Sequence, residues 1–263
     1  MKIKSLAIAA ATLAVGAITS EGQVYSLNIV GYVNSSIPTN GFALIANQLD
    51  VGDGTNGINQ VLANANLVSD GIGVNNTTVY LWQQSVQGFL ALQYYNAADA
   101  NSWWSGTQAG FYDFGGNYTN PPVPPGSVIF MQNPNNTVSN LTVTTAGTVL
   151  KSTNIVTISP GFQMEALSAP TASSLVLSQN YVGVSSPDGS TNDVLYVWNP
   201  SVQGYLALQY YNASDANTWW SGTQAGFYDF GGNYTNFAPN PGTGFFIQRV
   251  ANITTTWTNS FTY

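Results

Sequence analysis

Apolar and aromatic residues alternate with polar residues in short runs along most of the chain. Four runs rich in β-branched and aromatic residues span residues 24–33, 78–82, 127–131 and 141–145, each bounded by glycine, proline or asparagine. A period of two places successive side chains on opposite faces of a strand. The pattern predicts a mainly β protein built from antiparallel, half-buried strands.

Helix signals are scarce by comparison. The best are residues 57–65 and 97–104, and Asn96 and its counterpart Asn212 are suitable N-caps for the second signal and its repeat. We expect one or two short helices in each half of the chain, of two or three turns each.

The chain is a tandem duplication. Residues 85–120 recur as residues 201–236, offset by 116 positions and with only three differences. The offset predicts two tandem antiparallel β-sandwich or β-roll modules, residues 23–146 with an N-terminal strand at 23–33, and residues 147–263. Either local gene conversion or a shared constraint has kept residues 85–120 and their copy alike.

Residues 1–22 have the pattern of a secretory signal peptide. Lys2 and Lys4 precede an apolar stretch at residues 6–18, which is followed by small residues up to Gly22. No later stretch approaches the ~20 apolar residues of a membrane-spanning helix. We expect a secreted protein, extracellular or on the cell surface, without a transmembrane helix.

Charge narrows the choice of partner. Beyond Gly22 two cations, Lys151 and Arg249, stand against ten acids, a net charge of −8. Nucleic acids and anionic membranes are bound through clusters of Lys and Arg. The charge therefore argues against nucleic acid as a partner.

Three short motifs suggest a relationship. Residues 24–34 read VYSLNIVGYVN, residues 41–47 read GFALIAN and residues 241–247 read PGTGFFI. With these motifs the chain resembles uncharacterised secreted β-repeat proteins of verrucomicrobial bacteria and, more loosely, bacterial surface modules that begin Gly-Trp-Asn-Leu-Ile. The resemblance implies an extracellular β-rich protein and brings no activity. Phe42 and Phe162 stand where the surface modules have Trp.

The residue types leave little room for catalysis. With no His and no Cys, the Ser-His-acid triad, cysteine nucleophiles and ordinary zinc sites are excluded. Four duplicated acids, Asp99, Asp113, Asp215 and Asp229, lie near tryptophan pairs, where a sugar-cleaving site is one interpretation and turn or cap residues another. We interpret the chain as a protein that is not an enzyme and needs no cofactor.

Aromatic residues crowd the duplicated segment and suggest a sugar-binding surface. In a strand, neighbouring rings point to opposite faces, so each doublet is expected to place one ring outward, unless the rings serve only the β core. The candidate aromatic surface comprises Tyr94, Tyr95, Trp103, Trp104, Tyr112, Tyr210, Tyr211, Trp219, Trp220 and Tyr228.

Oxygen ligands in one loop suggest a calcium site. Asp50, Asp53 and Asn56 are spaced as in a calcium loop but lack the bidentate Glu of the twelve-residue type. Tight turns require the same residue types, so both interpretations stay open.

Self-assembly is the remaining interpretation. The duplication makes the N-terminal strand, the junction at 140–149 and the C-terminal residues equivalent, so the terminal strands could pair between molecules or within one module. The candidate assembly residues are Val24, Leu27, Ile29, Val33, Trp257, Phe261 and Tyr263.

The sequence therefore favours a secreted structural protein, a filament or surface-layer subunit that assembles head-to-tail with itself through terminal strands. The alternative is an aromatic-rich extracellular glycan-binding module. An outer-membrane β-barrel is the third interpretation, because aromatic residues alternate up to the C-terminus.

Overall fold

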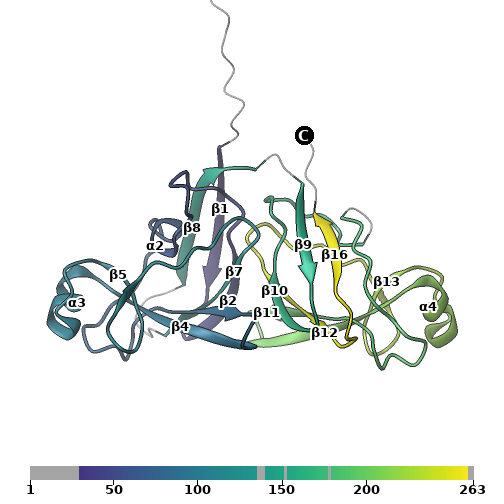
Figure 1. Cartoon of the computed structure of the whole chain (residues 1–263). Coiled ribbons are helices and arrows are strands. Elements are labelled where there is room, and N and C mark those ends of the chain that lie inside the picture. Colours follow the sequence, from purple (N-terminus) through teal and green to yellow (C-terminus); the bar gives the residue numbers. More distant parts are fainter. Residues whose placement is uncertain (1–29, 135–139, 151–152, 177–178, 260–263) are drawn as a thin grey trace, which may run out of the picture.

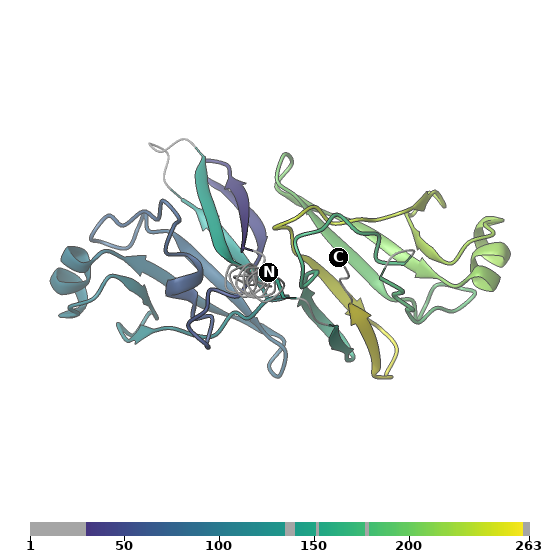
Figure 2. The same cartoon turned by 90° about the horizontal axis from the view of Figure 1, so that it is seen from above.

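The computed structural model describes residues 30–134, 140–150, 153–176 and 179–259. It is mainly β, as expected, and consists of two modules that lie side by side (Figure 1). Figure 2 shows from above that the two modules extend in opposite directions from the centre. No helix in the described ranges is long and apolar enough to span a membrane.

Each module has one antiparallel six-stranded sheet. In the first module the strand order is β2-β7-β3-β4-β5-β6, and in the second it is β10-β15-β11-β12-β13-β14. The first sheet comprises β2 (Gly41–Ala46), β3 (Thr78–Gln83), β4 (Gly88–Tyr95), β5 (Gly110–Tyr112), β6 (Tyr118–Thr119) and β7 (Val128–Asn133). The second comprises β10 (Gly161–Glu165), β11 (Val194–Asn199), β12 (Gly204–Tyr211), β13 (Gly226–Tyr228), β14 (Tyr234–Thr235) and β15 (Phe245–Arg249).

A two-stranded ribbon covers one face of each sheet. The ribbons are β1 (Val30–Ile37) with β8 (Leu141–Thr148), and β9 (Asn154–Ile158) with β16 (Thr255–Asn259). In the first module Ile37 and Leu141 of the ribbon are buried against Val79 and Ile129 of the sheet. This burial of alternate apolar residues produces the sandwich that the period of two predicts.

The terminal strands pair within their own modules. β1 pairs with β8 in register from Val30↔Thr148 to Ile37↔Leu141, and β16 pairs with β9. At the junction between the modules, β8 closes the first and β9 opens the second. Each module therefore has its own opening and closing strand, and β8 runs two residues beyond the expected boundary at residue 146.

The candidate assembly residues divide into two groups. Val33 is 5% exposed and packs with Leu49 of its own module and Ala169 of the second, whereas Trp257 is 2% exposed in the core of the second module. The others lie outside the described residues: Val24, Leu27, Ile29, Phe261 and Tyr263. Residues 1–22 also lie outside them, so export stays a prediction.

The expected helix caps are present. α3 (Ala97–Trp104) begins after Asn96, whose side chain accepts a hydrogen bond from the Asp99 amide, and α4 (Ala213–Trp220) begins in the same way after Asn212. The first helix signal gives only α2 (Ile58–Val61), shorter than expected. Figure 1 shows α3 and α4 at opposite ends of the molecule.

The second module contains a buried ion pair that the first lacks. Arg249 donates two hydrogen bonds to Asp193, at 2.9 and 2.6 Å, and both side chains are fully buried. The Tyr181 hydroxyl also donates to Asp193, at 2.7 Å. At the positions offset by 116 the first module has neutral residues, Thr77 and Asn133.

This difference predicts that a single and a double variant of the ion pair lose different amounts of stability. Arg249→Asn leaves the Asp193 carboxylate buried without its partner and should cost about 3–5 kcal/mol in the free energy of unfolding. The double variant Asp193→Thr with Arg249→Asn reproduces the first module's pair and should cost less. Urea denaturation followed by circular dichroism measures both, and an equal or larger loss in the double variant would contradict the account.

Candidate functional site

The structure corrects most of the predicted aromatic surface. Only Trp103 and Trp219 are largely exposed, at 49% and 50%. Buried residues are Tyr95, Tyr112, Tyr210, Tyr211 and Tyr228, and partly buried residues are Tyr94, Trp104 and Trp220.

A helix explains why the outward rings are covered. Tyr94 and Tyr95 point to opposite faces of β4 as expected, and Tyr94 joins the main core. Tyr95 lies on the other face, but α3 folds over that end of the sheet, so Tyr95 packs with Ala100 and Tyr112. The sequence pattern correctly predicts that Tyr95 lies on the face opposite the core, but it does not predict that α3 covers this face.

The duplicated acids serve turns and caps. Asp99 accepts hydrogen bonds from the Asn96 side chain and the Ser69 hydroxyl, and Asp113 accepts them from Gly115 and Asn117. The side-chain hydrogen bond from Asn117 is the main cause that lowers the pKa of Asp113. Asp215 and Asp229 repeat these contacts in the second module. These hydrogen bonds are typical of turn and helix-cap residues and favour that interpretation of the four acids over a sugar-cleaving site.

The proposed calcium loop uses its oxygens internally. Asp50 accepts a hydrogen bond from the Gly52 amide, Asp53 from the Thr55 and Asn56 amides, and Asn56 from the Val51 amide. Within the described ranges no three His, Cys, Asp or Glu side chains are grouped as a metal site would require. Calcium binding stays a prediction.

A different aromatic site lies between the modules. It is a groove of about 760 Å³, within the roughly 300–1,000 Å³ range of ligand pockets. We call it the aromatic groove. Its lining comprises Asn40, Phe42, Trp82, Phe89, Phe130, Phe162, Tyr196, Trp198, Gln203, Tyr205 and Phe246.

Strand alternation places these rings on the face opposite each core. In β3, Val79 and Leu81 point into the core of the first module, so Trp82 points to the other face. In β7, Ile129 belongs to that core and Phe130 to the opposite face. Both sheets therefore turn an aromatic face toward the groove.

The two modules contact each other reciprocally across the groove. The Trp82 indole N–H donates to the Phe162 carbonyl oxygen at 2.9 Å, and the Trp198 indole N–H donates to the Phe42 carbonyl oxygen at 2.8 Å. The ring of Trp82 meets Phe246 edge-on at 5.8 Å, as Trp198 meets Phe130 at 5.4 Å. Such an exchange of equivalent contacts is the pattern of a two-fold interface between identical subunits.

The tips of two hairpins complete this contact. Gln87, between β3 and β4, accepts a hydrogen bond from the Phe162 amide at 2.7 Å, and Gln203 accepts one from the Phe42 amide at the same distance. Both glutamines have a φ of 49°, in the left-handed region that non-glycine residues rarely adopt. Each tip therefore holds a strained residue whose side chain binds the other module.

Two rings of the groove lining are more exposed than the others, one from each module. Phe89 and Tyr205 occupy equivalent positions and are each 43% exposed. Burial raises the pKa of Tyr205 to about 12, so its hydroxyl stays protonated at neutral pH. The Tyr205 hydroxyl and the Asn40 amide make no side-chain hydrogen bond within the described part of the chain, and no lining residue is charged.

The residue pattern of β3 and its counterpart β11 is a sequence signal for this groove. Tyr80 and Trp82 alternate with Val79 and Leu81, and the same alternation recurs at 194–198. A strand with large apolar side chains on both faces has two faces to cover. The signal predicts a second buried or binding surface but does not show that the two modules share it.

One buried amide bridges the modules on the core side. The Gln48 side chain, 1% exposed, donates to the carbonyl oxygens of Leu167 and Ala169 and accepts from the Gly242 amide. Replacement by an apolar residue would leave these three backbone groups unpaired. An unpaired buried polar group costs about 1–3 kcal/mol.

Gln48→Leu should therefore lower the free energy of unfolding by at least ~2 kcal/mol. Gln108→Leu is the matched control, because Gln108 is exposed and its side chain makes no hydrogen bond within the described residues. Chemical denaturation of both variants tests the bridge. Equal stability of Gln48→Leu and the control would show that Gln48 does not hold the modules together.

No protein-family model, curated protein or solved structure matches this chain. The resemblance to secreted verrucomicrobial proteins stays a prediction. The function is therefore argued from the groove itself.

Proposed function

We propose that this protein is an exported, non-enzymatic binding protein whose aromatic groove holds a neutral glycan chain across the two modules. The observation that carries the proposal is the pair of exposed rings, Phe89 and Tyr205, set in equivalent positions of one continuous groove. Ring faces beside amide and hydroxyl groups suit the alternating apolar faces and hydroxyl edges of sugars.

Charge supports a neutral ligand. No cation or anion lines the groove, and Arg249, the cation in the described residues, is occupied by Asp193. An anionic polymer would find no counter-charge there, and a cationic one would find no carboxylate. The Tyr205 hydroxyl and the Asn40 amide offer hydrogen bonds to sugar hydroxyls.

Phe89→Ala with Tyr205→Ala should weaken glycan binding by tenfold or more, because loss of a central aromatic contact costs about 2 kcal/mol or more. The measurement is retention on an array of neutral polysaccharides, followed by calorimetric titration of the retained sugar. The reciprocal hydrogen bonds of Trp82 and Trp198 do not involve these two rings, which pack edge-on against the indoles at 5.0 and 4.8 Å.

The control is Phe114→Ala with Phe230→Ala, a pair of equally duplicated rings, each 65% exposed, outside the groove. Their loss should leave the affinity unchanged. Absence of binding to every neutral glycan would contradict the proposal. Loss of binding only in Trp103→Ala with Trp219→Ala would move the site to the ends of the molecule, where those exposed rings lie on α3 and α4.

Self-assembly into an extracellular filament or surface layer is a second proposal. It is supported by two exposed apolar residues at the start of β1, Val30 at 62% and Tyr32 at 72%. Exposed apolar residues on a strand with a free edge favour pairing with another chain. A donated β1 would have to exchange its eight pairs with β8 for equivalent pairs in a neighbour.

Negative-stain electron microscopy of residues 23–263 across a concentration series tests assembly. Regular fibres should form and should be lost in Val30→Thr with Tyr32→Thr. Particles of monomer size at every concentration would contradict this second proposal and leave the glycan proposal intact.

A further inference from the structure

The contact between the modules is closed on one side of its pseudo-two-fold axis. There the Ala46 amide donates to the Gly242 carbonyl oxygen at 2.9 Å, and the Gly244 amide donates to the Leu44 carbonyl oxygen at 3.2 Å. The edge strand β2 thereby pairs with the segment that leads into β15. Its backbone donors and acceptors are satisfied by the other module.

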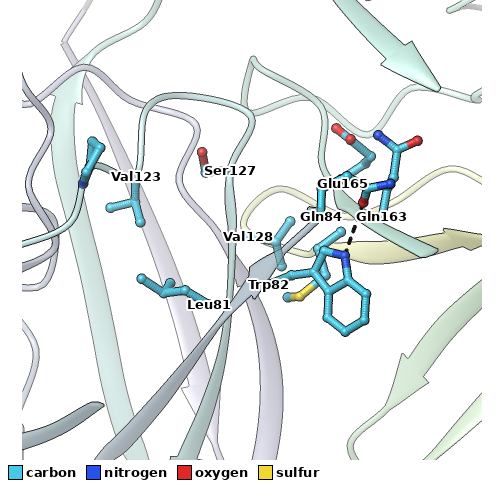
Figure 3. A pocket seen from close by; sticks show the side chains of 10 residues that line it. Leu81, Trp82, Gln84, Val123, Ser127, Val128, Gln163 and Glu165 are labelled. Atoms are coloured by element: carbon cyan, nitrogen blue, oxygen red, sulfur yellow. Dashed lines mark hydrogen bonds between the residues drawn. The ribbon is translucent and has the colours of Figure 1, made fainter. Parts of the chain in front are cut away.

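The equivalent side is open. The counterparts are β10 and residues 126–128, yet within the described ranges no backbone hydrogen bond joins them. A cavity of about 200 Å³ lies there instead, lined by both modules. We call it the seam cavity; Figure 3 shows Glu165, Gln163 and Gln84 gathered near Trp82 at one end of it.

Glu165 is the unusual member of this lining. Its carboxylate makes no hydrogen bond or ion pair within the described part of the chain, although Gln84 and Gln163 are both engaged, with Trp82 and with backbone groups of 157–159. The equivalent position in the first module is Ile45, which is buried in the core. A carboxyl group thus stands where the other copy has an apolar side chain.

Among the described residues, no neighbouring charge favours ionisation of this carboxyl. β3 contributes Tyr80, which lies on the groove side, and neither β7 nor residues 122–128 carry an acid or base. β15, paired with β10, carries Arg249 opposite Gly161 at the far end, where Asp193 holds it. Burial alone raises the pKa of Glu165 to about 8.

We propose that Glu165 makes the contact between the two modules sensitive to pH, so that loss of its proton to solvent loosens the seam and the aromatic groove with it. Trp82 transmits the effect, because it lines both the seam cavity and the groove. This inference goes beyond ligand binding and does not depend on the identity of the ligand.

The direction in which stability changes with pH follows from the protonation of Glu165 in the folded and unfolded states. An ordinary glutamate ionises near pH 4.5 in the unfolded chain, whereas the folded chain holds the proton until about pH 8. Between these values the folded state binds more protons than the unfolded state, so stability falls as pH rises. Above about pH 8 this loss of stability is complete, and below pH 4.5 there is no loss.

The chain permits a direct titration of this group. Glu21 and Glu165 are its two glutamates, so protein spanning residues 23–263 contains one. With carboxyl-labelled glutamate, the carbon signal should titrate near pH 8 in NMR spectra. A midpoint near pH 4.5 would overturn the proposal without the use of any variant.

A second experiment measures whether the contact between the modules loosens at high pH. The absence of cysteine allows spin labels at Asn101→Cys and Asn217→Cys, two exposed equivalent positions on α3 and α4. The distance distribution between the labels should broaden from pH 6 to pH 9.5, and Glu165→Gln should abolish the change. Identical distributions at both pH values, or broadening that persists in Glu165→Gln, would overturn the proposal.

A thermal control separates the seam from general alkaline effects. Glu165→Gln should melt at a higher temperature than the natural chain at pH 9 and at the same temperature at pH 4. Asp113→Asn, an exposed carboxyl whose pKa is lowered, should show no such gain at pH 9. A gain in both variants would refute a specific role for Glu165.

Discussion

The reciprocal contact between the two modules is the constraint on which the rest of the structure depends. Each module donates an indole N–H from a central strand to a carbonyl oxygen on the other module's edge strand. Each also accepts that strand's amide with a glutamine at a hairpin tip. These contacts bring two aromatic sheet faces together, and the aromatic groove exists only because both faces meet. Apart from this contact, each face would expose phenylalanine and tryptophan to water.

The duplicated chain has the reciprocal contacts of a two-fold dimer, but its two halves are joined in one chain and differ in sequence. Where the halves differ, the difference has a structural consequence. Thr77 and Asn133 of one half correspond to the buried pair Asp193 and Arg249 of the other. Ile45 corresponds to Glu165, on opposite sides of the pseudo-axis. Asymmetry of this kind is available to a fused chain and not to two identical subunits.

Much of the fold could be predicted from local pattern. The alternation at 78–82 and 141–145 gave β3 and β8, and Asn96 gave the start of α3, because strand faces and helix caps depend on neighbouring residues. The site could not be predicted in this way. Tyr95 is covered by a helix that follows it, and Trp82 meets Phe162 across 80 positions of sequence, so burial and exposure were decided by tertiary contacts. The strand that opens the second module also depends on long-range pairing, since β9 pairs with β16 near the end of the chain.

Hydrogen–deuterium exchange with a panel of soluble neutral hexasaccharides tests the central claim, that a ligand lies across both modules, most directly. The account predicts slower exchange in the first module at β2 and at the tip between β3 and β4, with the same change at β10 and the tip between β11 and β12. Protection confined to one module, or to the ends that carry α3 and α4, would contradict it. So would unchanged exchange with every sugar.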